Sequence, residues 1–145
     1  PRMRLAAGRQ IPDFVLAAVN HQDLTILGDG TREDSYCYIS DMIQGLVALM
    51  RSAVNVPVNL GNPVMHKTID IARTVIKLVG AKSNVVFSDA LVGLARSLPP
   101  DIARARQLLG WFPVTDIQVG LQRTIDDMMG AQVLTYQSPP RQMAG

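Results

Sequence analysis

Short strand-like runs alternate with helix-like stretches along most of this chain, and this order limits the fold more than any other feature of the sequence. Apolar residues recur at helical spacing in five stretches, at about residues 11–20, 41–53, 68–79, 102–109 and 117–129. Runs typical of short strands lie between them, at about residues 23–27, 35–39, 56–62 and 84–89. Because the two kinds alternate, the sequence predicts an α/β fold with about five helices and four short strands in a small sheet.

Residues that commonly end helices and strands lie at the borders of these stretches. The predicted helix caps are Ser40, Asp101 and Asp116 at N-termini, and Gly80 and Gly110 at C-termini. Gly28-Asp29-Gly30 is a strong turn signal at the end of the first strand. Trp111, the only tryptophan, is expected to anchor the last helices in the core.

The predicted sheet is too small to bind a dinucleotide. Four short strands fall short of a full dinucleotide-binding sheet, and neither a glycine-rich dinucleotide fingerprint nor a G-x-x-x-x-G-K-[ST] loop occurs. We therefore expect this chain to bind no cofactor. Residues 1–130 are predicted to form one lobe, and residues 131–145, which include the polar and Pro-rich "QSPPRQMAG", a flexible tail.

Composition excludes several kinds of site. At 145 residues and 48% hydrophobic, the chain can form one compact domain. The net charge is +2 and the basic residues are scattered, which argues against a nucleic-acid groove or a membrane patch. Cys37 is the only cysteine, so neither an internal disulfide nor a cysteine-based zinc site can form, no metal site is expected, and a reducing, cytoplasmic compartment fits best.

The sequence shows neither a membrane span nor a secretory signal. No stretch approaches the roughly 20 apolar residues of a membrane span. The opening residues "PRMRLAAGRQ" lack the apolar core of a secretory signal. Because the chain opens on Pro1 without an initiating Met, we expect it to be cut from something longer.

An ordered series of motifs carries a family resemblance. The motifs are "PRM", "GRQIPDF", "LTILGDGT", "SYCYISDMIQGLVALM", "VNLGNP", "PPDIARARQLLGWFPV" and "GLQRTI". Over roughly residues 1–130 and in one register, they resemble the C-terminal portion of the extended short-chain dehydrogenase/reductases of the NAD-dependent epimerase/dehydratase type. Within that family they are most similar to the UDP-glucuronate decarboxylase (UDP-xylose synthase) branch, a group of lyases, and next to the dTDP-glucose 4,6-dehydratases.

The resemblance implies that the catalytic machinery lies upstream of the matched segment. In this family an N-terminal Rossmann domain carries NAD, and a Tyr-x-x-x-Lys pair serves as the catalytic base system. The tyrosines here, Tyr36, Tyr38 and Tyr136, are followed four positions on by serine, methionine and proline. We therefore expect a truncated family member with no catalytic residue, no NAD site and no activity alone.

The resemblance also implies which residues approach a nucleotide sugar. The candidate substrate-binding residues are Arg2, Met3, Arg9, Leu27, Gly28, Gly30, Arg32 and Asp34. Leu27 replaces a tyrosine that stacks on uracil in the family. The Gly28–Gly30 turn has two interpretations, a plain turn or a backbone approach to a diphosphate.

Two cationic positions of the family have lost their charge in this chain. Asp34 stands where the family has an arginine that contacts the diphosphate, and Leu98 and Pro99 stand where it has a second basic element. Each charge-assisted bond to a phosphate contributes about 1.5–3 kcal/mol, so affinity should fall by roughly a hundredfold or more. Arg32 could substitute, but strand alternation is expected to point its side chain away from the side occupied by Asp34.

These observations leave functions of different classes open. The first is a sugar-nucleotide-binding lobe with weak UDP-sugar affinity. The second is a non-catalytic module whose exposed apolar faces form a homodimer or bind another protein. A third is the corresponding lobe of a dTDP-glucose 4,6-dehydratase or an epimerase.

Overall fold

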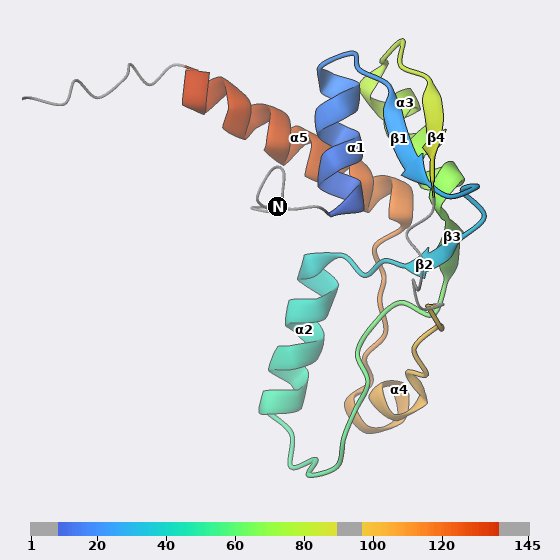
Figure 1. Ribbon diagram of the computed structural model, residues 1–145. Helices are drawn as coiled ribbons and strands as arrows, with labels where there is room; N and C mark the ends of the chain where they lie inside the picture. Colours follow the sequence, from blue (N-terminus) through green and yellow to red (C-terminus); the bar gives the residue numbers. More distant parts are fainter. Residues whose placement is uncertain (1–8, 90–96, 137–145) are drawn as a thin grey trace, which may run out of the picture.

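The computed structural model describes residues 9–89 and 97–136, and this part of the chain contains five helices and four strands in mixed order (Figure 1). In chain order they are α1 Gln10–Val19, β1 Leu24–Leu27, β2 Glu33–Ser35, α2 Ile39–Met50, β3 Met65–Lys67, α3 Thr68–Val79, β4 Val85–Ser88, α4 Ala103–Leu109 and α5 Ile117–Tyr136. The α/β class and the number of elements predicted from the sequence are confirmed for this part of the chain. Arg2 and Met3 lie outside the described residues.

The strands form two separate pairs. β1 and β4 are parallel, in a register that runs from Leu24 opposite Val85 to Leu27 opposite Ser88. β2 and β3 are antiparallel, with Glu33 opposite Lys67. A parallel pair requires a long crossover, and here α3 is the last helix of the crossover that connects β1 to β4. The described strands thus make two small sheets instead of one.

The larger hydrophobic cluster lies where α1, α3, α5 and β1 meet (Figure 1). Leu24 and Ile26 alternate with exposed residues along β1, which is the pattern of a strand with one covered face. From the helices, Val15, Val75 and Ile125 are almost completely buried against them. Burying each such side chain contributes about 1.5–3 kcal/mol, so this cluster stabilises the part of the fold that holds β1 in place.

A smaller cluster forms around Trp111, between α2 and α4. Trp111 is 6% exposed and packs with Ile102 and Ala105. Its Nε1–H donates to the carbonyl oxygen of Asp41 at 2.9 Å. A Cβ on Gly45 would lie 2.9 Å from Cε2 of Trp111, so only a glycine lets α2 approach the indole this closely. The predicted role of Trp111 as a core anchor is confirmed.

The strand predicted at 35–39 is wrong. The strand β2 is Glu33–Ser35, and α2 already begins at Ile39, with Tyr38 and not Ser40 at its N-cap position. The alternation that suggested a strand has another cause. Tyr36 packs against the larger cluster and the next residue, Cys37, against the smaller one, so an extended segment between two cores shows period-two patterning without pairing in a sheet.

The strand predicted at 56–62 is also wrong, and β3 was missed. Residues 56–62 have no strand assignment; Val58 and Leu60 instead pack against the smaller cluster, and Asn59 donates from Nδ2 to the carbonyl oxygen of Asp101 at 3.1 Å. β3 has only three residues, Met65–Lys67, and includes a histidine and a lysine. A strand of three residues, of which only Met65 is apolar, is too short to show a hydrophobic pattern of its own.

The predicted helix ends are partly confirmed. Gly80 and Gly110 both adopt the left-handed conformation, with φ of 71° and 62°. Asp101 and Asp116 accept hydrogen bonds from the N–H groups of Ala103 and Gln118, at 2.9 and 2.8 Å. The predicted end of the last helix at Met129 is wrong, because α5 runs to Tyr136 and crosses the lobe border expected at residue 130.

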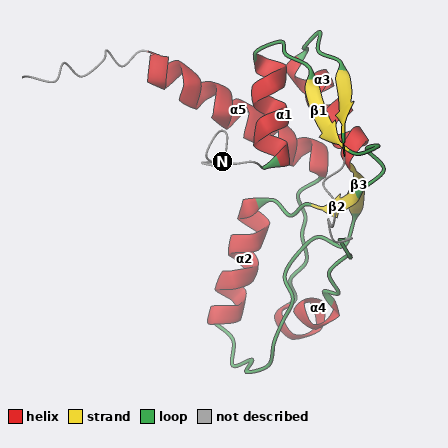
Figure 2. Cartoon of the chain, in the orientation of Figure 1, coloured by secondary structure: helices red, strands yellow, loops and turns green. Residues whose placement is uncertain are grey.

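Two parts of the structure are joined by loops (Figure 2). α2 and α4 lie together below the strand pairs in this view, and mainly loop segments connect them to the part that holds α1, α3 and α5.

Candidate functional site

The glycine turn after β1 is packed tightly against its neighbours. Gly28 and Gly30 have φ of 83° and 77°, a conformation that side chains disfavour. The N–H of Gly28 donates to the carbonyl oxygen of Ser88 at 2.8 Å. A Cβ on Gly30 would lie 3.1 Å from Cβ of Ile69 and 3.2 Å from Cε1 of Phe87. Close packing therefore explains the second glycine without a ligand.

The acid in the middle of this turn accepts hydrogen bonds from the turn itself. Oδ1 of Asp29 accepts from the hydroxyl of Thr31 at 2.6 Å and from its backbone N–H at 2.9 Å. These bonds, the side-chain bond first, hold the pKa of the Asp29 carboxyl below its usual value. A backbone donor that could face a phosphate is thus already bound to a carboxylate.

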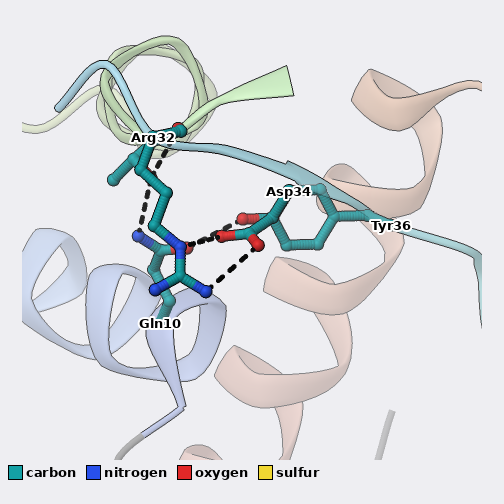
Figure 3. Close-up of polar contacts among 5 residues, drawn as sticks. Gln10, Arg32, Asp34 and Tyr36 are labelled. Carbon is teal, nitrogen blue, oxygen red and sulfur yellow. Dashed lines mark hydrogen bonds and ion pairs between the residues drawn. The ribbon is translucent and has the colours of Figure 1, made fainter. Parts of the chain in front are cut away.

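Arg32 and Asp34 form an ion pair on one side of the chain (Figure 3). Nε of Arg32 lies 3.1 Å from Oδ2 of Asp34, and Nη2 lies 3.3 Å from Oδ1. The prediction that Arg32 would point away from Asp34 is wrong, because residues two apart on an extended chain share a face. The arrangement is the two-pronged geometry in which arginine binds carboxylates and phosphates.

A chain of hydrogen bonds connects this segment to α1 and α3 (Figure 3). The Tyr36 hydroxyl donates to Oε1 of Gln10 at 2.8 Å, and Nε2 of Gln10 donates to Oγ1 of Thr68 at 3.2 Å. Thr68 in turn donates to the carbonyl oxygen of Arg32, from Oγ1 at 3.2 Å and from its N–H at 2.9 Å. The backbone of Arg32 is therefore fixed on α3, whatever its side chain binds.

The pKa of Tyr36 is shifted both by its burial and by the charge of Asp34. Burial, followed by the negative charge of Asp34, raises the pKa of Tyr36 to about 12, although Arg32 opposes the shift. The phenol is thus neutral at any physiological pH. At Tyr36 the negative charge of Asp34 therefore outweighs the positive charge of Arg32.

A cavity of about 440 Å³ lies next to this segment, between the two hydrophobic clusters. Its walls are Arg9, Ile11, Ser35, Tyr36, Cys37, Tyr38, Ile39, Met42, Thr115, Asp116, Ile117, Gly120, Leu121 and Thr124. Most of these side chains are apolar or aromatic, and Arg9 is the one guanidinium in the wall. The volume falls within the usual range for small-molecule sites.

The structure brings together only some of the predicted site residues. Arg9 is exposed and lies in the cavity wall. Leu27 is 48% exposed at the end of β1, next to the glycine turn. Leu98 and Pro99 are exposed, and neither side chain carries a charge. The candidate residues from Leu27 to Asp34 thus lie at or next to the β1–β2 turn, and Arg9 lies apart from them in sequence, in the wall of the cavity.

Asp41 is a buried carboxylate that the sequence analysis took only for part of a helix. It is 2% exposed, and its oxygens accept from Thr115 Oγ1 and N–H at 2.8 Å each and from the N–H of Val114 at 3.0 Å. Burial alone would raise the pKa of Asp41, but the bonds from Thr115, Val114 and Ser40 outweigh it and lower that pKa. An acid in the first turn of an apolar helix was the signal that could have revealed it.

Metal-ligating groups and membrane-spanning helices are both missing from the described residues. No group of three or more His, Cys, Asp or Glu residues in residues 9–89 and 97–136 is arranged to hold a metal ion. None of the helices in that part of the chain is both long and apolar enough to cross a membrane.

The sequence matches proteins of known activity. The sequence profile of the NAD dependent epimerase/dehydratase family matches residues 1–61. UDP-glucuronic acid decarboxylase 1 of Xenopus tropicalis is 41% identical over 125 residues, which are 86% of this chain and 30% of that protein. UDP-glucuronic acid decarboxylase 3 of Arabidopsis thaliana is 33% identical over 127 residues, 88% of this chain and 37% of that protein.

The fold is similar to solved structures. An epimerase from Methanothermobacter thermautotrophicus superposes with a TM-score of 0.83 at 28% identity, over 90% of this chain and 40% of that one. The UDP-glucuronic acid 4-epimerase of Bacillus cereus, solved with UDP-glucuronic acid and NAD, gives a TM-score of 0.82 at 26% identity, over 90% of this chain and 42% of that one. The chain therefore spans about a third of the decarboxylases it matches and two fifths of these epimerases.

Proposed function

Because this chain belongs to the NAD dependent epimerase/dehydratase family, we propose that it is the sugar-nucleotide-binding lobe of a UDP-glucuronate decarboxylase-like protein. The observation that carries this proposal is the 41% identity to a UDP-glucuronic acid decarboxylase over 86% of the chain. The similarity in fold to an epimerase solved with UDP-glucuronic acid supports the same ligand class.

The lobe would hold a UDP-sugar weakly and mainly by its uridine end. Leu27 offers an exposed apolar surface at the edge of the glycine turn, and Arg9 lies on the wall of the nearby cavity. On the side where a diphosphate would lie, the donors of Thr31 and Arg32 are engaged by Asp29 and Asp34. Little is left to hold two phosphates, whose charge-assisted bonds normally supply much of the affinity.

The described residues do not fit a nicotinamide dinucleotide. A dinucleotide fold needs a glycine-rich turn that leads from a strand into a helix N-terminus, where the pyrophosphate binds. Here the glycine turn after β1 leads into another strand, β2. We therefore assign this chain no step of the oxidation and decarboxylation by which the complete family members convert UDP-glucuronate to UDP-xylose.

A calorimetric titration with UDP-glucuronate tests the proposal. We expect saturable binding with a dissociation constant in the millimolar range, about −4 kcal/mol. dTDP-glucose, titrated in parallel, separates a UDP-sugar lobe from the dehydratase alternative, whereas UDP-glucose, which has the same uridine end as UDP-glucuronate, should bind about equally well. The absence of saturable binding of every nucleotide sugar, with the protein folded, would contradict the proposal.

A second candidate function is a self-association module, and one surface favours it. Five apolar residues on α2 are exposed, and we call them the α2 stripe: Ile39, Ile43, Leu46, Val47 and Met50. Met50 is 83% exposed. Their spacing follows the helical repeat, so they share a face, and a continuous apolar face of this kind commonly marks an interface.

Molar mass in solution separates this candidate from a lobe that stays monomeric. If the α2 stripe forms a homodimer, the wild-type chain elutes as a dimer in size exclusion with light scattering, and Ile43→Lys elutes as a monomer. Val119→Lys introduces the same charge at an exposed apolar residue of α5 and should leave the dimer intact. A monomeric wild-type chain at high micromolar concentration rules out this candidate.

A further inference from the structure

The donors around the β1–β2 turn are matched by acceptors of the same chain. The Gly28 N–H is bound to the carbonyl oxygen of Ser88, the Thr31 N–H to Asp29, and the Arg32 guanidinium to Asp34. The first bond joins the residue after β1 to the end of β4, and the second lies within the turn itself. The third joins the side chain of Arg32, just before β2, to that of Asp34 within β2. It has no role in the shape of the backbone, so it calls for a separate explanation.

We propose that Asp34 is a built-in anion that occupies the guanidinium of Arg32 and so determines whether this lobe holds a diphosphate. The inference rests on the proposed function, because it concerns the phosphate end of the same ligand. Both carboxylate oxygens face the guanidinium, at 3.1 Å from Nε and 3.3 Å from Nη2, in the geometry that a phosphate would otherwise use.

The position of Arg32 suits it to bind an external anion once Asp34 is removed. Its side chain is 40% exposed, so a ligand from solvent can reach it. Its backbone carbonyl accepts two bonds from Thr68 at the start of α3, at 2.9 and 3.2 Å. Because these bonds fix the main chain, replacing Asp34 frees the guanidinium without moving the residue that carries it.

Asp34 has two advantages over a dissolved anion. It is tethered two residues from Arg32, so its effective concentration at the guanidinium is far above that of a free ligand. Its charge also reaches its neighbours on the same face, since after burial it is the second cause of the raised pKa of Tyr36. A diphosphate would therefore have to displace a tethered carboxylate and then lie beside it, like charge against like charge.

The chain offers a matched pair of variants. Asp34→Asn removes the charge that pairs with Arg32. Glu33→Gln removes the same charge one residue earlier, at an exposed position on the opposite face of β2. An exposed ion pair contributes little to stability, so both variants should fold, which backbone amide spectra can confirm. Asp34→Ser is a second variant for the same purpose.

Inorganic pyrophosphate is the probe, and the Nε–H resonance of Arg32 is the readout. We expect Asp34→Asn to bind pyrophosphate about tenfold more tightly than either the wild-type chain or Glu33→Gln. The chemical shift of the Arg32 Nε–H should change as pyrophosphate binds. Adding Arg32→Gln to Asp34→Asn should abolish the gain. The inference is overturned if Asp34→Asn and Asp34→Ser bind no more tightly than Glu33→Gln, or if the gain survives Arg32→Gln.

Failure of this inference is distinguishable from failure of the proposed function. If pyrophosphate binds the Asp34 variants at Arg32 but no variant binds a nucleotide sugar, the built-in anion is supported and the sugar-nucleotide function is not. If the wild-type chain binds UDP-glucuronate and the Asp34 variants gain nothing for pyrophosphate, the function stands and the built-in anion is overturned.

Discussion

Asp41 connects α2 to the segment before α5 through a fully buried carboxylate. Its oxygens accept from the N–H groups of Val114 and Thr115 and from the Thr115 hydroxyl. Its backbone carbonyl accepts from Trp111. One residue thus holds the smaller cluster and the start of α5 in a fixed relation, and the cavity wall includes residues from this same junction.

Asp41→Asn should destabilise the fold by about 2–4 kcal/mol, because hydrogen bonds to a charged group contribute about 1.5–3 kcal/mol each. The NH2 group of the asparagine would also face N–H and O–H donors that now bind a carboxylate oxygen. Urea unfolding followed by circular dichroism measures the change. Asp116→Asn is the control, since it makes the same substitution at an exposed cap position where asparagine caps equally well. Equal losses in the two variants would contradict this account of Asp41.

The carboxylate of Asp41 should also make the free energy of unfolding depend on pH. Its pKa is lowered in the folded state, so the ionised form is favoured by folding. The resulting stability is fully present above the unfolded value of 3.8 and is lost as the pH falls through the lower folded pKa. Unfolding free energies measured from pH 6 to pH 2 should therefore fall less steeply for Asp41→Asn than for the wild-type chain; parallel curves would contradict the assignment.

At the scale of elements, α2 depends on a glycine. Gly45→Ala would place a Cβ 2.9 Å from Trp111 and 3.1 Å from Leu60, so it should cost about 1–3 kcal/mol through overpacking. Gly130→Ala in α5 meets nothing within 4 Å and should stabilise the helix by about 0.5–1 kcal/mol. Thermal unfolding of the two variants measures both; a Gly45→Ala chain as stable as Gly130→Ala would refute the close approach of α2 to the indole.

The elements also show what a sequence pattern can and cannot predict. The helical repeat of α3 and its Gly80 end were predictable, since an amphipathic helix and its cap are local features. Residues 36–38 were not, because alternation there reflects packing against two separate clusters. β3 was not predictable either, since its pairing partner β2 lies about 30 residues away and only one of its three residues, Met65, is apolar.

At the scale of the whole molecule, the charge of the candidate site was predictable, and the two-residue spacing of Arg32 and Asp34 also allows their side chains to share a face. The acid at position 34 could be recognised from the family resemblance, and it predicts poor diphosphate binding. That Asp34 would instead bind Arg32 depends on both side chains lying on one face next to Gln10 and Tyr36 (Figure 3). The cavity could not be predicted, since its walls come from three regions far apart in the sequence.

The ratio of UDP to uridine affinity tests the central claim most directly. The lobe is proposed to hold a nucleotide by its uridine end, with a turn whose donors are already engaged by Asp29 and Asp34. Titrations of the wild-type chain with UDP and with uridine, followed by amide shifts, should therefore give dissociation constants within about threefold of each other. UDP binding a hundredfold tighter than uridine, with shifts at residues 28–34, would contradict the account.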